Sequence, residues 1–355
     1  MSRADEAARR ETLRVQVRLD ALVAAIGQDG DGRPRPEPER RLVLDAARSA
    51  LDRLADPGLP AAPPGAADAT LLPETIIANT YAVRERIGRG GLAEIYRVRH
   101  RDLRGDHAAK ILRPDRALDP VLARLHVSEA RALMGLSHPA IPRARDLLRH
   151  GDGRAVIVMD LLRGETLAET LRTHGPLPPD GVAALARRLA GALAAVHAAG
   201  LVHGDVSPEN VMLCGGAEGA TLIDFGVVRR VGEALPDVEF AGKWSVAAPE
   251  QLAGRPGGPP ADLYALGLLL AAASRGERVG LGRDRESALA ARASLPDPRI
   301  DGRLGKVVRD LLRQDPGARP DAEAVMQRLS RTPLSRLAAR LTAPRGAYPH
   351  PETEG

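Results

Sequence analysis

The chain has 355 residues, 44% of them hydrophobic, which is enough for one two-lobed domain with an extension or for two small domains. Its formal net charge of +5 permits nucleic-acid binding, but the arginines are scattered and aromatic residues make up only 2%, so we expect no nucleic-acid partner.

No apolar run approaches the roughly 18 residues of a membrane-spanning helix. The single cysteine, Cys214, excludes an internal disulfide, and the first residues lack the apolar core of a signal peptide, so we expect a cytoplasmic protein with no membrane partner.

Residues 1–72 are predicted to form an extension separate from the rest of the chain. Apolar residues recur at helical spacing from Val15 to Ile26 and from Val43 to Leu54, with a Gly- and Pro-rich break between them. This pattern predicts two amphipathic helices within residues 1–56, followed by a Pro- and Ala-rich linker over residues 57–72. The helices are expected to contact the rest of the chain, a second copy or a partner protein, and all three remain open.

From Tyr81 onward the chain changes to short β-branched runs that alternate with glycine-rich turns. The runs predict strands over residues 81–87, 93–98, 108–112, 144–148 and 155–159. A helix is expected around residues 122–136, and helices dominate beyond Leu167, the longest at residues 181–199. Residues 331–355 predict a short helix and a Pro-rich, partly disordered end.

Two features of the β-rich part point to phosphate binding. Gly88-Arg89-Gly90-Gly91 lies between two predicted strands, where glycines let backbone N–H groups approach phosphate oxygens, although such a run alone is usually only a tight turn. Lys110 follows on the third strand of a chain that otherwise uses arginine, since its only other lysines are Lys243 and Lys306. The alternative is that Lys110 forms a surface salt bridge, which would contribute little to stability. The scarcity of lysine in this chain favours instead a chemical role for Lys110.

The strongest chemical signal is the run His203-Gly204-Asp205-Val206-Ser207-Pro208-Glu209-Asn210, which is followed by Asp224-Phe225-Gly226. Asp205 can accept a proton, while Asn210 and Asp224 offer the hard oxygen ligands that magnesium prefers. Phosphoryl transfer from ATP needs such groups close together, because its catalysis is mostly positioning and neutralisation of phosphate charge. Nineteen positions separate Asp205 from Asp224, enough for two short strands to bring both loops to one edge.

Taken together, these motifs resemble the bacterial serine/threonine protein kinases of the eukaryotic-like, or Hanks, type, over residues 81–330. The resemblance implies an α+β, bilobal fold with a small β-rich N-terminal lobe and a larger helical C-terminal lobe. It also implies transfer of the γ-phosphate of ATP to Ser or Thr hydroxyls of a protein substrate, with Mg²⁺ or Mn²⁺ as the metal. Glu250 of Ala248-Pro249-Glu250 resembles the family's buried ion-pair partner of Arg319, and Asp262 resembles the residue that anchors the catalytic loop.

The same resemblance implies roles for individual residues. Lys110 would pair with the α- and β-phosphates while Glu129 holds its ammonium group, and Asp205 would accept the proton of the substrate hydroxyl or orient it. Asn210 and Asp224 would bind the metal. The implied nucleotide site consists of Ile87, Gly88, Arg89, Gly90, Gly91, Ile95, Ala108, Lys110 and the backbone of Asp160 and Leu162.

The chain departs from the family pattern at Gly204, which stands where most members carry an arginine that pairs with a phosphorylated activation segment. The corresponding segment, residues 227–247, contains one hydroxyl side chain, Ser245, and no Thr or Tyr. We therefore predict that activity does not depend on phosphorylation of this segment.

A second departure links Ser207 and Lys243. Ser207 stands where most serine/threonine kinases have a lysine that touches the γ-phosphate, and Lys243 stands where they have a threonine. Compared with most serine/threonine kinases, the hydroxyl and the ammonium group look exchanged between these two positions, as in a subset of bacterial kinases. We predict that Lys243 supplies the missing charge at the γ-phosphate, the alternative being an unrelated exposed lysine.

Two other functions remain open at this point. The run His203-Gly204-Asp205 with Asn210 also resembles small-molecule phosphotransferases of the aminoglycoside or choline kinase kind, which usually lack the features at Glu250, Asp262 and Arg319. A non-catalytic scaffold that only binds nucleotide is the third reading, because a fold does not establish a function.

Overall fold

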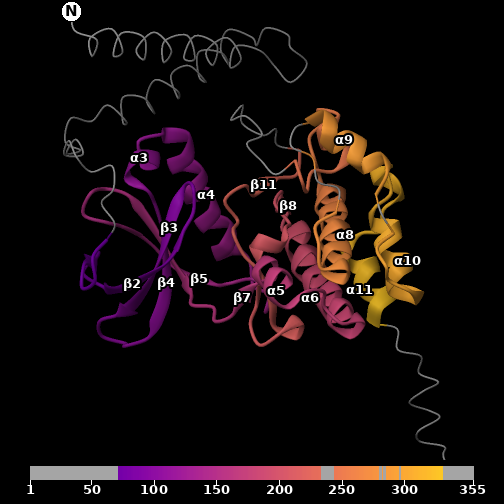
Figure 1. Cartoon of the computed structure of the whole chain (residues 1–355). Coiled ribbons are helices and arrows are strands. Elements are labelled where there is room, and N and C mark those ends of the chain that lie inside the picture. The colour runs from indigo at the N-terminus through magenta and orange to yellow at the C-terminus, as the bar shows by residue number, and fades with distance from the viewer. Residues whose placement is uncertain (1–70, 233–243, 280–281, 283–284, 296, 331–355) are drawn as a thin grey trace, which may run out of the picture. The chain divides into compact units, whose positions relative to one another are not determined.

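The computed structural model describes residues 71–232, 244–279, 282, 285–295 and 297–330. The predicted helices of residues 1–56, Lys243 and the C-terminal tail lie outside the described residues. Figure 1 shows the described chain as two lobes, one rich in strands and one mostly helical, which is the α+β bilobal fold expected from the sequence. Within the described ranges no helix is long and apolar enough to cross a membrane.

The small lobe is built on an antiparallel sheet of six strands in the order β1-β2-β3-β4-β6-β5. The strands are β1 (Ile76–Ile77), β2 (Tyr81–Arg89), β3 (Ala93–His100), β4 (Asp106–Leu112), β5 (Ala144–Arg149) and β6 (Ala155–Asp160). Five of them lie where the β-branched runs predicted strands. The sequence did not predict β1, because two residues are too few for an alternating pattern.

Alternation along the strands gives the sheet two different faces. One face contributes Tyr96, Ala109 and Ile111 to the buried core of the lobe. Leu71 joins this core, and its backbone N–H donates to the hydroxyl of Tyr96 at 2.9 Å, so the packed lobe begins inside the stretch expected to be a linker. The opposite face carries Lys110 and its cross-strand partner Ile95.

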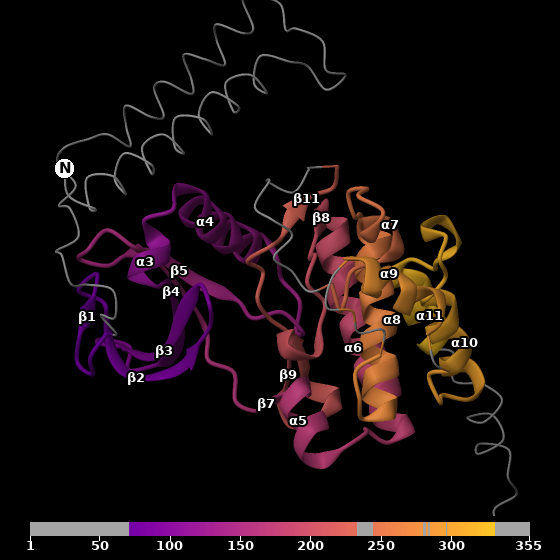
Figure 2. The same cartoon turned by 45° about the horizontal axis from the view of Figure 1, so that its top comes forward.

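Helix α4 (Pro120–Gly135) lies alongside the sheet on the side nearer the large lobe (Figures 1 and 2). It starts sharply, because the Asp119 carboxylate accepts the N–H of Val121 at 2.8 Å and a proline occupies the first turn. A short helix, α3 (Pro114–Ala117), precedes it. Glu129 is 3% exposed on α4, and this burial already requires a partner for its carboxylate.

The large lobe is organised around α8 (Pro259–Arg275). Residues 261–273 of this helix are all buried, and it ends at Gly276, whose φ of +75° suits glycine. Both cartoons show α8 beside α6 (Figures 1 and 2). The other helical elements are α5 (Leu167–His174), α6 (Pro179–Ala198), η2 (Pro208–Asn210), η3 (Ala217–Gly219), α7 (Pro249–Leu252), α9 (Arg285–Ala293), α10 (Gly302–Leu311), η4 (Pro316–Ala318) and α11 (Ala322–Ser330).

Short strands in the large lobe position the loops next to the small lobe. The strands β7 (Glu165–Thr166), β9 (Val211–Leu213) and β10 (Ala220–Leu222) form one sheet, and β8 (Leu201–Val202) pairs with β11 (Arg229–Arg230). Val211 faces Leu222 across the β9–β10 pair. Since β9 starts just after Asn210 and β10 ends just before Asp224, these two strands bring both residues to one edge, as the spacing predicted.

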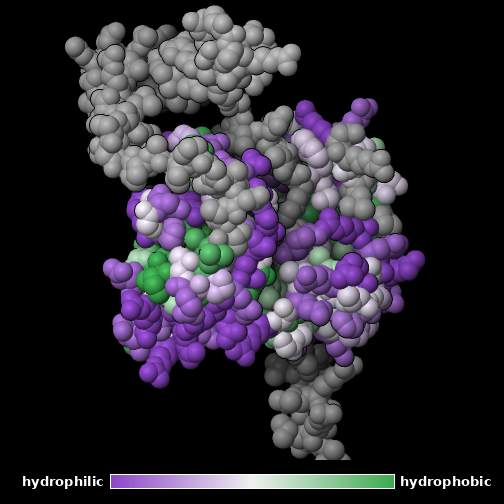
Figure 3. Space-filling model, turned by 60° about the vertical axis from the view of Figure 1, so that its left-hand side comes forward, coloured by the Kyte–Doolittle hydropathy of each residue, from purple (hydrophilic) through white to green (hydrophobic). Residues whose placement is uncertain are grey.

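The surface on the small-lobe side is mostly hydrophilic, with an apolar area on the lobe itself (Figure 3). Among the most exposed apolar side chains of this lobe are Leu72 and Leu103. Arginines and acidic residues pair across neighbouring strands, for example Arg97 of β3 with Asp106 of β4 at 2.6 Å. Such exposed pairs contribute little to stability, so this face serves mainly to solvate the lobe.

Candidate active site

Lys110 lies at the centre of the site. Its Nζ atom is 2.6 Å from Glu129 Oε1 of α4 and 2.7 Å from Asp224 Oδ1, a residue 114 positions away in the sequence. Burial lowers the pKa of Lys110, but the two carboxylates outweigh burial and hold the pKa above its usual value. The expected contact between Lys110 and Glu129 is therefore present, and the ammonium group stays charged.

Asp224 adopts an uncommon backbone conformation. Its φ is +63°, in the left-handed region that non-glycine residues rarely occupy, and in this conformation its carboxylate accepts from Lys110. Burial raises the pKa of Asp224, yet the charge of Lys110 outweighs it and lowers the pKa to about 2. The carboxylate is thus ionised at neutral pH.

Gly226 marks the point where these charges converge. A Cβ atom at this position would lie 3.1 Å from Asp224 Oδ1, 3.7 Å from Glu129 Oε2 and 3.8 Å from Lys110 Nζ. Its N–H also donates to Asp224 Oδ1 at 3.3 Å. A side chain here would crowd the Asp224 carboxylate and contact the other two charged groups, so the glycine leaves the most room beside Asp224.

The catalytic loop is anchored from α8. The Asp262 carboxylate accepts the backbone N–H groups of His203 and Gly204, each at 2.8 Å, and also contacts His197 Nε2 at 2.9 Å. Asp262 is 2% exposed. These bonds confirm the expectation that Asp262 anchors this loop.

His203 and Phe225 pack together beneath the loop, with ring centroids 4.7 Å apart in an edge-to-face arrangement. Burial lowers the pKa of His203, and its Nδ1 atom lies 3.3 Å from the N–H of Asp205, which fits a neutral imidazole that accepts this bond. The two rings are therefore packing residues, as expected.

Asp205 and Asn210 face each other across the turn of the catalytic loop. The Asn210 amide donates to Asp205 Oδ2 at 2.7 Å and to the Asp205 carbonyl at 3.0 Å. The Asn210 carbonyl in turn accepts the N–H of Ile223 at 2.8 Å, which links this loop to the residue before Asp224. These bonds tie the Asp205 carboxylate to Asn210 and the catalytic loop to the residue before Asp224.

The oxygens of Asn210 and Asp224 fit a divalent metal. Because the Asn210 nitrogen is bound to Asp205, its side-chain oxygen is the atom left for a metal, and Asp224 adds a carboxylate. Both are hard oxygen ligands of the kind that Mg²⁺ and Mn²⁺ use. The described part of the chain holds no group of three or more His, Cys, Asp or Glu side chains that could bind a metal alone. Phosphate oxygens would have to complete the coordination.

The glycine-rich loop joins β2 and β3. The Gly90 N–H donates to the Ala93 carbonyl at 2.8 Å, which closes the turn. Below it lies Glu94, a residue that the sequence analysis missed: its buried carboxylate accepts from Arg86 at 3.1 Å and from the Tyr96 hydroxyl at 2.5 Å. No sequence signal marks Glu94, because its partners come from two different strands.

The remaining residues of the expected nucleotide site lie on one face of the sheet or at its edge. Ile95 pairs with Lys110, and Ala108 pairs with Met159 of β6. Ile87, on β2, is 47% exposed. The N–H of Asp160 donates to the Arg143 carbonyl at 3.1 Å, so a backbone contact of Asp160 with adenine would have to use its carbonyl. Leu162 follows in the connection between the lobes, half-buried.

The second expected departure is only partly described. Ser207 is fully buried in the catalytic loop, whereas Lys243 lies outside the described residues. The exchange of a hydroxyl and an ammonium between these positions stays a prediction.

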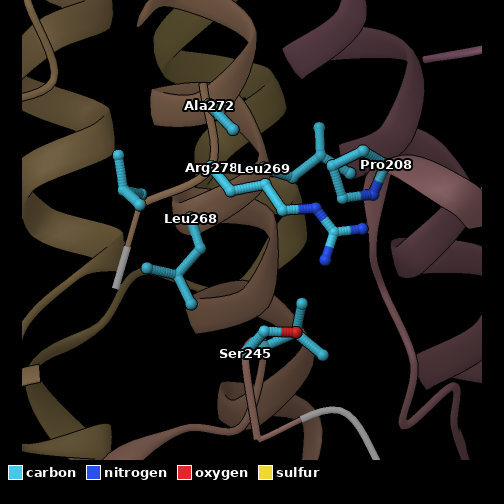
Figure 4. A pocket seen from close by; sticks show the side chains of 8 residues that line it. Pro208, Ser245, Leu268, Leu269, Ala272 and Arg278 are labelled. Carbon is cyan, nitrogen blue, oxygen red and sulfur yellow. The ribbon is translucent and has the colours of Figure 1, made fainter. Parts of the chain in front are cut away.

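A small pocket adjoins the catalytic loop (Figure 4). Pro208 forms one side, Ser245 lies across from it, and the Arg278 side chain extends from beyond α8 toward Pro208. Arg278 is ion-paired with Glu209, the residue between Pro208 and Asn210. Sequence reasoning missed this pair. It places the Arg278 guanidinium beside Glu209, a residue of the same loop as Asp205.

The expected ion pair between Glu250 and Arg319 is also present. The two side chains form a bidentate pair with distances of 2.7 and 2.8 Å, and Arg319 donates to the carbonyl groups of Arg313, Pro260 and Gln314. The Arg319 guanidinium lies 4.7 Å from the ring centroid of Tyr264. This cluster fixes α7 on the large lobe.

Comparison with known proteins agrees with this geometry. The family described as protein kinase domain matches residues 81–329. The chain belongs to the protein kinase family. Its curated relatives are bacterial serine/threonine protein kinases, which puts this kinase domain in the Hanks-type group.

Three relatives illustrate the likeness. The chain is 36% identical to the serine/threonine-protein kinase PkaA of Streptomyces coelicolor over 272 residues, covering 70% of this chain and 49% of that protein. It is 37% identical to PkaB of the same organism over 203 residues (55% and 48%) and 35% identical to PknL of Mycobacterium tuberculosis over 204 residues (56% and 50%). The chain thus spans about half the length of the curated relatives it matches.

Proposed function

We propose that this chain is an active protein kinase that transfers the γ-phosphate of ATP to Ser or Thr hydroxyls of protein substrates. The observation that carries the proposal is the meeting of Lys110, Glu129 and Asp224 at Gly226, beside the Asp205–Asn210 pair. Such an arrangement of an ammonium, carboxylates and an amide suits a metal-bound triphosphate. The family match and the Glu250–Arg319 and Asp262 contacts favour a protein substrate over a small alcohol.

Each residue has a distinct part in this reaction. Lys110 donates to the α- and β-phosphates, and Glu129 holds its ammonium group in place. Asp205 receives the proton of the substrate hydroxyl as its oxygen bonds to the γ-phosphorus, while the bond from phosphorus to the β–γ bridging oxygen breaks. Asn210 and Asp224 would hold Mg²⁺ or Mn²⁺, and the metal would neutralise phosphate charge.

The direct test uses labelled ATP and Mg²⁺ with generic protein acceptors and, separately, small alcohols. We expect label on protein, and Asp205→Ala should lower kcat by about 10²- to 10⁴-fold. Asp102→Ala, which removes an exposed turn carboxylate, is the control and should keep wild-type activity. Label on small alcohols alone would identify a small-molecule phosphotransferase. Nucleotide binding without any transfer would identify a scaffold.

We further propose that activity does not require a phosphorylated activation segment. Gly204 in place of arginine and a single hydroxyl, Ser245, in residues 227–247 support this. Protein treated with a phosphatase, and shown by intact mass to carry no phosphate, should keep its kcat. A large loss that returns on rephosphorylation would contradict the proposal.

Lys243 is proposed to supply the charge that Ser207 cannot supply at the γ-phosphate. Lys243→Met should therefore lower kcat by about 10²-fold or more, as expected for loss of a contact to developing charge. Lys306→Met removes an exposed lysine of α10 and is the matched control. Wild-type kcat in Lys243→Met would show that the lysine is unrelated to catalysis.

Two further proposals rest on the sequence alone. The predicted helices of residues 1–56 would bind a partner or a second copy, which concentration-dependent sedimentation of the full chain would reveal. A cytoplasmic location would appear as enzyme in the soluble cell fraction, and recovery in the membrane fraction would contradict it.

A further inference from the structure

Arg229 is a buried cation in the activation segment. It is 7% exposed and lies on β11, where it pairs with Val202 of β8. Two residues separate Val202 from Asp205, so the strand pair joins the activation segment directly to the catalytic loop. A buried guanidinium is costly unless its hydrogen bonds are made, and one of them goes to the carbonyl of Gly257, in the connection after α7.

The side chain lies against Gly204. A Cβ atom at Gly204 would be 3.1 Å from Arg229 Nη1 and 3.3 Å from the Val227 carbonyl, and the φ of Gly204 is +79°. A side chain at position 204 would crowd the guanidinium by a few tenths of an ångström and would sit on a backbone conformation that favours glycine. The glycine at position 204 therefore leaves room for the Arg229 guanidinium beside the catalytic loop.

We propose that Arg229 is a positioning residue that holds the activation segment on the catalytic loop in place of a phosphate-dependent contact. This rests on the proposed kinase function and gives the described start of the segment, residues 227–232, a contact that does not need phosphorylation. The backbone of Arg229 pairs the segment after Asp224 with β8, which precedes Asp205, and its side chain binds the Gly257 connection next to the Glu250 helix. The cation binds a carbonyl of the protein itself, so the contact needs no modification to form.

Arg229→Met tests this directly in phosphate-free full-length protein. We expect kcat to fall by about 10- to 100-fold, as for a small misplacement of catalytic groups, with KM for ATP unchanged because Lys110 and Glu129 are untouched. Arg229→Lys, which keeps one donor for Gly257, should recover part of the loss.

The matched control is Arg188→Met. Arg188 of α6 also donates to two backbone carbonyls, at 3.0 Å to Ala220 and 2.6 Å to Pro139, but it has no contact with the activation segment among the described residues. It should lower the melting temperature and leave kcat unchanged. Equal losses of kcat in both variants would mean general destabilisation and would overturn the proposal, as would wild-type kcat in Arg229→Met.

Gly204→Ala provides a second test that does not remove the cation. Its Cβ should displace Arg229, so kcat should fall in the wild-type background but little further in Arg229→Met. Additive losses would contradict the proposal, even if Arg229→Met alone folded poorly. An inactive wild-type protein would instead overturn the proposed function, and with it this inference.

Discussion

Two buried ion pairs among the described residues, Arg319–Glu250 and Lys110–Glu129, differ in how completely they are satisfied. Arg319 and Glu250 are bidentate, with side chains 0% and 6% exposed, and three carbonyls and a tyrosine ring surround the guanidinium. Lys110 makes single bonds to Glu129 and to Asp224, whose side chain is 48% exposed. We call the Arg319–Glu250 pair closed, because it is fully satisfied and can only stabilise the fold. We call the Lys110–Glu129 pair open, because Lys110 also contacts the solvent-exposed Asp224 and can still receive a ligand there.

Removing the closed pair should have the largest effect. Arg319→Met leaves the Glu250 carboxylate buried without its partner, which should lower the free energy of unfolding by about 3–5 kcal/mol. Urea denaturation measures this loss. Arg309→Met, on the exposed face of α10, should change stability by no more than about 0.5 kcal/mol. If the two variants unfolded at the same urea concentration, the closed pair would have no structural role.

Removing the open pair should affect activity instead. Lys110→Met should lower kcat/KM by about 10²- to 10³-fold, because an aimed cation at the phosphates is lost. Because Glu129 is 3% exposed and loses its lysine, the melting temperature should also fall, but less than that of Arg319→Met, since Asp224 can turn to solvent. Lys306→Met is again the control. A Lys110→Met protein that fails to fold while Arg319→Met folds normally would reverse the comparison.

The smallest effect concerns pH. His203 is fully buried and its pKa is lowered, so below pH ~6.5 the unfolded chain binds a proton that the folded protein does not, and stability falls as the pH falls. His203→Gln should flatten this dependence by at most about 1.4 kcal/mol per pH unit. His174→Gln, which removes an exposed imidazole, should not. Urea titrations from roughly pH 5 to pH 8 span the range in which histidine titrates. If stability changed with pH at the same rate in wild type and in His203→Gln, the pH dependence could not be assigned to His203.

The sequence predicted those parts of the fold that depend on local pattern. Five of the small-lobe strands, β2 to β6, and the helices near residues 122–136 and 181–199 follow from β-branched runs and apolar spacing, and each lies close to its predicted bounds. The contacts of Asp262 and of Glu250 with Arg319 followed from the family resemblance, because the motifs fix which residues must meet.

What the sequence could not predict are contacts between segments without a motif. Glu94 is buried because Arg86 and Tyr96 reach it from separate strands. The position of Arg229 against Gly204 is visible only in the structure, where a Cβ atom at Gly204 would approach its guanidinium. The same holds for Arg278, which is recognised by its ion pair with Glu209. In a chain so rich in arginine, no compositional signal separates these side chains from solvated ones.

The position of Asp262 near the start of α8 has a consequence for how the enzyme loses activity. The helix that carries it is the most enclosed element of the large lobe, and the loop bearing Asp205 is bonded to its first turn. Amide hydrogens of His203 and Gly204 should therefore exchange with deuterium only as slowly as the interior of α8 opens. Thermal inactivation and global unfolding should consequently occur at the same temperature, because the catalytic loop cannot unfold locally while α8 stays folded.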